Sequence, residues 1–158
     1  MFKHVIWATD GSEFADEALP YAKRLAAGEG HELVVVHTGE RFVGGRSSGE
    51  PLRADEDELE SKILRQAADA RAEGLDVSTR FRTGSPAHTA DVIAELAREV
   101  DADVIVVGTR GYGPAIGFFV GSVTQRLLHT SPCPVLAIPA GAARGRREST
   151  ETAEVSRS

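Results

Sequence analysis

The stretch from Val107 to Thr124, V-G-T-R-G-Y-G-P-A-I-G-F-F-V-G-S-V-T, holds the residues best suited to chemistry in this sequence. Gly108, Gly111 and Gly121 leave no Cβ in the way of a ligand that approaches the main chain. Ser122 begins a helical pattern, and the N–H groups and dipole of a helix start attract anions. The pattern predicts a phosphate-binding loop. A surface loop with glycine turns is the alternative, because such loops are common.

The sequence lacks the side chains that usually turn phosphate binding into efficient catalysis. Its lysines are Lys3, Lys23 and Lys62, and none follows a glycine as the lysine of a P-loop does. Arg110 lies within the glycine-rich stretch and could reach a phosphate, although it could equally be an ordinary surface arginine. We therefore expect a binding module rather than an enzyme, with slow hydrolysis at most.

Other nucleophiles and metal ligands are poorly placed. Cys133 is the single cysteine, which excludes an intramolecular disulfide and a thiolate metal cluster. It stands between two prolines, where packing at a rigid turn is the simplest role. The histidines fall on different segments without the spacing of metal ligands: His4, His31, His37, His88 and His129. His37 is best interpreted as a hydrogen-bonded residue at the end of a strand.

Strands and helices must alternate to position the glycine-rich stretch. Short apolar runs predict four buried strands, at 4–8, 33–37, 103–107 and 135–138. One run that alternates between apolar and polar residues predicts an edge strand at 77–82. Capping residues predict the starts of three intervening helices, at Ser12, at Asp55 with Glu58, and at Ser85-Pro86, and a further helix is expected from about Ser122 to His129. Pro20 lies inside the first helix and should bend it. This order predicts an α/β fold, with an open five-stranded parallel sheet and helices on both faces.

Length and charge limit the function classes. The chain of 158 residues suits one domain, expected at 1–140, followed by a mixed-charge tail at 141–158 that is expected to be disordered. A net charge of −6 without a basic stripe disfavours nucleic-acid binding. No apolar run approaches the length of a membrane span, so we expect no membrane association. The single cysteine fits a reducing compartment, and we expect a cytoplasmic protein.

Several ordered motifs point to one family. Gly108 and Gly111, nine residues, and then Gly121-Ser122 form the pattern G-x-x-G-x9-G-S. The segment A-T-D-G-S at 8–12 follows the first strand, His37 ends the second, and S-P-C-P-V-L at 131–136 leads into the last. From Phe2 to Ala140 the chain resembles the universal stress protein family of ATP-binding type.

The resemblance implies a Rossmann-like fold, similar to that of adenine nucleotide alpha hydrolases, with strand order 3-2-1-4-5. It implies that ATP binds with Mg²⁺ or Mn²⁺ held through the phosphates. Asp10 would lie at the adenine and ribose end, the backbone near Ala8 and Thr38 would frame the adenine, and Val107 and Gly108 would pack on the ribose. The implied phosphate contacts are Gly111, Gly121, Ser122, Val123 and Thr124, with Arg110 as a further candidate. A carboxylate repels phosphates, so Asp10 should contact hydroxyl or amine donors instead, or a bridging divalent metal.

Three functions remain open at this point. The first is an ATP-binding stress-response and signalling module whose occupancy changes a partner interaction. The second is a slow ATPase or phosphotransferase. The third is a structural stress protein of the same fold that binds no nucleotide. The family resemblance also implies a homodimer through the last strand, 135–138, where an exposed edge would otherwise remain.

Overall fold

The computed structural model describes residues 2–40, 51–110 and 120–142. Five strands are formed: β1 (His4–Ala8), β2 (Glu32–Glu40), β3 (Asp76–Gly84), β4 (Val104–Gly108) and β5 (Val135–Ile138). The helices are α1 (Glu13–Asp16), α2 (Leu19–Leu25), α3 (Pro51–Ala72), the short 3₁₀ helix η1 (Pro86–His88), α4 (Thr89–Glu99) and α5 (Ser122–Thr130).

The strands form a single parallel sheet in the order β3-β2-β1-β4-β5, which confirms the predicted fold class and strand order. Ile6 in β1 pairs with Val34 in β2 on one side and with Ile105 in β4 on the other. The chain first winds outward from β1 through β2 to β3, and then crosses back to β4. The topological switch point therefore lies between β1 and β4, where open α/β sheets bind ligands.

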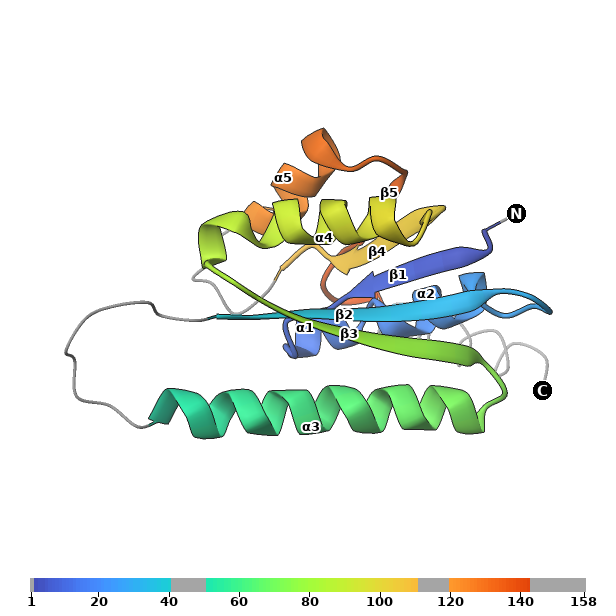
Figure 1. Cartoon of the computed structure of the whole chain (residues 1–158), viewed down its shortest axis with the longest axis horizontal. Coiled ribbons are helices and arrows are strands. Elements are labelled where there is room, and N and C mark those ends of the chain that lie inside the picture. Colours follow the sequence, from blue (N-terminus) through green and yellow to red (C-terminus); the bar gives the residue numbers. More distant parts are fainter. Residues whose placement is uncertain (1, 41–50, 111–119, 143–158) are drawn as a thin grey trace, which may run out of the picture.

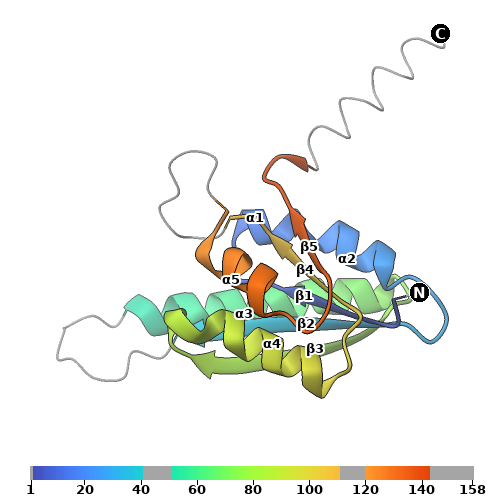
Figure 2. The same cartoon turned by 90° about the horizontal axis from the view of Figure 1, so that it is seen from above.

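Helices cover both faces of the sheet (Figures 1 and 2). Helices α1, α2 and α3 lie on one face, and α4 and α5 lie on the other. Alternate residues of each strand point to opposite faces, so Val5 and Trp7 enter one core while Ile6 and Ala8 enter the other. Burial on both faces explains why β1, β2 and β4 contain continuous apolar runs, whereas the edge strand β3 alternates.

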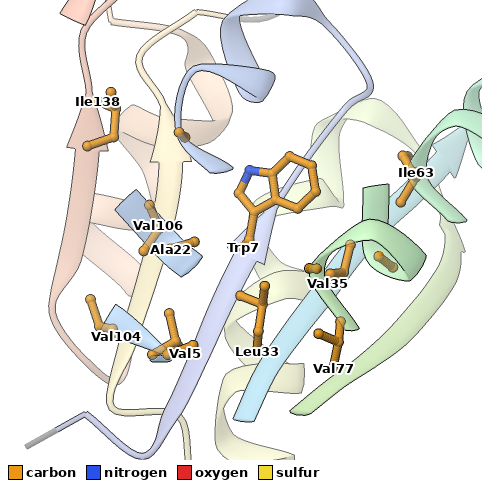
Figure 3. Close-up of a cluster of buried hydrophobic side chains, with 14 residues drawn as sticks. Val5, Trp7, Ala22, Leu33, Val35, Ile63, Val77, Val104, Val106 and Ile138 are labelled. Atoms are coloured by element: carbon orange, nitrogen blue, oxygen red, sulfur yellow. The ribbon is translucent and has the colours of Figure 1, made fainter. Parts of the chain in front are cut away.

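Trp7 is the largest side chain of the first core and is fully buried (Figure 3). Its indole N–H donates to the carbonyl of Ala15 at 3.1 Å, which satisfies the only polar atom of the ring. Ala18 and Ala22 of the neighbouring segment are also fully buried. These small residues let the helical segment approach the sheet closely beside the end of β1.

The first helical segment differs from the expected single bent helix. Ser12 caps α1 as predicted, since its hydroxyl accepts the N–H of Ala15 at 3.2 Å. The helix then ends at Asp16, and α2 begins at Leu19 with Pro20 in its first turn. A proline in the first turn removes no hydrogen bond of the helix, because the first N–H groups of a helix have no partner within it. The prediction of one continuous bent helix was wrong.

Other predicted boundaries shift by a few residues. Helix α3 begins at Pro51, so the predicted cap at Asp55 was wrong; a proline suits a first helical position. Strand β2 runs to Glu40, beyond the predicted end at His37. The edge position of β3 is confirmed. Of the predicted tail, 143–158 lies outside the described residues, whereas the N–H of Gly141 donates to the Glu17 carboxylate at 2.5 Å.

Candidate functional site

The carboxyl ends of β1, β2 and β4 meet at one edge of the sheet. Ala8 pairs with Val36, and Trp7 pairs with Val106, so the residues that follow each strand come together there. Asp10 follows β1, and Thr38 lies near the end of β2. The structure thus brings the predicted residues of three separate sequence segments to the switch point.

The loop of residues 9–12 after β1, called here the Asp10 loop, is shaped by its own side chains. The N–H of Thr9 donates to the Val36 carbonyl at 2.9 Å and continues the sheet. The Thr9 hydroxyl accepts the N–H of Gly11, and the Asp10 carboxylate accepts the N–H of Ser12, each at 3.0 Å. Gly11 has φ +79°, a conformation that glycine adopts without strain. The half-buried Asp10 is consequently presented at the start of α1.

Helix α5 begins directly beside the end of β4. The N–H of Gly121, the N-cap residue, donates to the Thr109 carbonyl at 2.6 Å. Gly121 has no side chain with which to cap α5, and the first N–H groups of a helix have no partner within it. Ser122 is exposed and Val123 is half-buried. The positive end of the α5 dipole therefore lies at the same edge of the sheet as the Asp10 loop.

Two predicted site residues have structural roles that need no ligand. A Cβ on Gly108 would lie 2.7 Å from the carbonyl oxygen of Phe14, so close packing against α1 alone requires glycine there. The buried hydroxyl of Thr124 donates to the Gly108 carbonyl at 2.8 Å and ties α5 to β4. Any phosphate contact from Thr124 as placed here would use its main-chain N–H.

The remaining predicted residues are distributed around this edge. Ala8 and Val107 are buried in the core beneath it, and Arg110 is half-buried at its rim. The hydroxyl oxygen of Thr38 is buried and has no hydrogen-bond partner within the described structure. A buried polar atom of this kind favours a ligand or water as its partner. Gly111 lies outside the described residues.

Reasoning from sequence missed the side chains of α3 that contact the Asp10 loop. His37 is 4% exposed and has partners on both ring nitrogens: Nδ1 is 2.9 Å from the Thr9 carbonyl, and Nε2 is 2.6 Å from Glu56. This confirms that His37 is hydrogen-bonded, although it lies inside β2 rather than at the end of the strand. Lys62 donates to the Gly11 carbonyl at 2.8 Å. The predicted helix includes Glu56 and Lys62, but nothing in the sequence identified their partners.

Within 2–40, 51–110 and 120–142, no three His, Cys, Asp or Glu side chains form a group that could hold a metal ion. Cys133 is half-buried, and burial raises the pKa of its thiol, which agrees with the packing role expected for it. Every helix described here is too short or too polar to cross a bilayer.

The family assignment follows from comparison with known proteins. The model of the universal stress protein family matches residues 1–139. The chain belongs to the universal stress protein family. A universal stress protein of Thermus aquaticus is 35% identical over 141 residues, covering 87% of this chain and 99% of that protein. One from Bacillus subtilis is 32% identical over 150 residues, covering 87% and 99% respectively.

Solved structures of family members share the fold. The crystal structure of a universal stress protein in complex with cAMP has a TM-score of 0.65 and 30% identity, covering 87% of this chain and 97% of that one. A universal stress protein from Archaeoglobus fulgidus in complex with dAMP has a TM-score of 0.62 and 26% identity, covering 87% and 98%. Both of those proteins bind an adenine nucleotide.

Proposed function

We propose that this protein binds ATP at the edge of the sheet where β1 and β4 end, and that it acts as a nucleotide-dependent module in stress response or signalling. The observation that carries the proposal is the convergence of the Asp10 loop with the start of α5 at the switch point. The Gly121 N–H bonded to Thr109 brings the helix start there. Relatives solved with cAMP and dAMP support an adenine nucleotide as the ligand.

The nucleoside would lie toward β1 and β2. Asp10 would accept hydrogen bonds from ribose hydroxyls or the adenine amine. The backbone of Ala8 and Thr38 would frame the base, and the buried Thr38 hydroxyl offers it a further polar partner. Val107 and Gly108 would pack on the ribose. Buried apolar walls with a few placed polar groups are typical of small-molecule sites.

The phosphates would lie at the start of α5. Main-chain N–H groups of Ser122, Val123 and Thr124 can donate to phosphate oxygens, and the helix dipole favours their negative charge. Gly121, Gly111 and Arg110 complete the proposed phosphate contacts. Because the described residues hold no cluster of metal ligands, Mg²⁺ or Mn²⁺ would be bound mainly through phosphate oxygens.

We propose a binding role rather than rapid hydrolysis. Two of the lysines already have partners: Lys23 pairs with Glu73, and Lys62 pairs with Asp16. Fast phosphoryl transfer requires positive charge at the developing transition state and a positioned water molecule. The lysine side chains that hold these structural pairs are not available for that task.

The proposed assembly is a cytoplasmic homodimer formed through β5. This strand lies at the end of the sheet, opposite the other edge strand β3. Leu136 of β5 is 37% exposed, and Leu128 of the adjacent α5 is 54% exposed. An exposed edge strand beside apolar side chains is commonly covered by a partner. The unpaired thiol of Cys133 agrees with a reducing compartment.

Mass spectrometry of the nucleotide released from purified protein tests the ligand assignment. We expect an adenine nucleotide with three phosphates. Release of a different nucleotide would correct the ligand but keep the site. If nothing is released and the stripped protein does not bind added ATP, the proposed function is wrong, and a structural role for the fold becomes the better explanation.

A further inference from the structure

Three residues of α3, spaced three apart, support the Asp10 loop: Leu59 and Lys62 contact it directly, and Glu56 acts through His37. Residues three apart lie near the same face of a helix. The Lys62 ammonium donates to the Gly11 carbonyl at 2.8 Å and to the Asp16 carboxylate at 2.6 Å. A Cβ built on Gly11 would overlap Leu59, so the helix packs directly against the loop backbone.

Glu56 reaches the loop through His37. The Thr9 carbonyl can only accept a hydrogen bond, so Nδ1 of His37 must carry a proton. Nε2 faces a Glu56 carboxylate oxygen at 2.6 Å, and one of these two atoms must also carry a proton. The pair thus shares one proton and stays neutral overall, which suits the nearly complete burial of His37.

These contacts hold the backbone on both sides of Asp10. The carbonyl of Thr9 precedes it and the carbonyl of Gly11 follows it, and α3 holds both through His37–Glu56 and Lys62. Hydrogen bonds within the loop define its shape, whereas the contacts from α3, together with the bond from the Thr9 N–H to the Val36 carbonyl, fix its place against the sheet edge. Displacement of α3 would therefore move the Asp10 carboxylate.

We propose that Glu56 and Lys62 are positioning residues that set the place of Asp10 against the nucleoside half of the bound nucleotide. The inference rests on the proposed nucleotide site. Lys62 and Asp16 are half-buried, at 33% and 28% exposed, so solvent still screens part of their attraction and the pair adds only modestly to stability. Loss of Lys62 should therefore weaken nucleotide binding clearly while lowering the melting temperature only a little.

Calorimetric titration of ATP and AMP into Lys62→Met tests the role of Lys62. We expect affinity to fall about five- to fifty-fold, as for residues coupled within one hydrogen-bond network. The factor should be the same for both ligands, since they share the nucleoside. Lys23→Met is the matched control, because it removes another lysine–carboxylate pair, with Glu73, and should leave affinity unchanged. Lys62→Arg should largely retain binding.

A double-mutant cycle separates positioning from general structural damage. If Lys62 acts through Asp10, then Lys62→Met should cause little further loss in an Asp10→Ala background. Damage elsewhere in the site would instead add to the loss caused by Asp10→Ala. Additive effects would overturn the inference.

Glu56 provides an independent variant should Lys62→Met fail to fold. Glu56→Gln should keep ATP affinity, because its amide can donate to a neutral Nε2 while Nδ1 still donates to Thr9. Glu56→Ala should lose affinity. If both Lys62→Met and Glu56→Ala bind ATP as the parent does, the positioning role is refuted but the proposed nucleotide site is not. A parent protein that binds neither ATP nor AMP would refute the proposed function and this inference with it.

Discussion

Replacement of Gly121 by valine should abolish ATP binding while the fold survives. Gly121 has φ −56° and ψ 151°, a conformation that any residue can adopt. A Cβ there would lie 3.3 Å from the Thr109 carbonyl oxygen, which requires a shift of only a few tenths of an ångström. Loss of a favourable N-cap residue should cost about 1 kcal/mol and lower the melting temperature by about 2–4 °C.

The effect on binding should be much larger. A branched side chain at the N-cap would occupy space through which phosphate oxygens approach the N–H groups of Ser122 and Val123. Hydrogen bonds to charged groups contribute about 1.5–3 kcal/mol each. Loss of two such bonds corresponds to about 3–6 kcal/mol, or more than about a hundredfold in affinity.

Calorimetric titration of ATP into the parent, Gly121→Ala and Gly121→Val measures this difference, and circular dichroism on the same samples measures folding. The alanine variant should fold like the parent and lose part of the affinity, because its side chain is smaller. Parent-like ATP binding by a folded Gly121→Val would refute the reasoning. A valine variant that is unfolded would show that the packing argument from the Thr109 contact is wrong.

Four further outcomes are expected. Among the site variants, Asp10→Ala should weaken ATP binding least, Ser122→Ala should weaken it more, and Gly121→Val should weaken it most. A different order of affinities in calorimetric titration would contradict this ranking. Leu136→Lys should shift the sedimenting species from dimer to monomer, whereas a parent that already sediments as a monomer would remove the dimer proposal. Truncation after Ala142 should leave the melting temperature unchanged, and a large drop would show that 143–158 stabilises the domain. The backbone N–H groups of His4 and Lys3, of which His4 has the larger effect, lower the pKa of Asp103, so its carboxylate stabilises the fold at any pH above its unfolded-state pKa. Asp103→Asn should therefore lower the melting temperature at neutral pH, and the difference from the parent should disappear as the pH falls below the lowered pKa. A difference that does not depend on pH would contradict this.

Strands β1, β2 and β4 were predictable because their central residues are buried on both faces, and β3 was predictable because its alternating sequence is typical of an edge strand. Val34 and Val36 face one core while Leu33 and Val35 face the other, and no polar residue interrupts the run. Helix boundaries depended more on tertiary packing. Pro20 marked an interruption, but whether the helix bends or divides depended on how the flanking alanines pack against the sheet.

The sequence predicted where the candidate site residues lie in the fold, but not the contacts that hold them there. The glycine pattern located Gly108 and Gly121 correctly at the end of β4 and the start of α5. Sequence could not show that Gly108 is required by the Phe14 carbonyl, because that contact depends on the approach of α1. Lys62 is 51 residues from Gly11 in the chain, and only the folded structure shows that the two are hydrogen-bonded.

Calorimetric titration of ATP, in the presence of Mg²⁺, into the parent protein stripped of nucleotide tests whether this sheet edge binds a nucleotide. We predict saturable binding with one ATP per chain, and displacement of the bound ATP by excess AMP. Absence of binding heat, together with an unchanged melting temperature at saturating ATP, would contradict the assignment of this sheet edge as a nucleotide site.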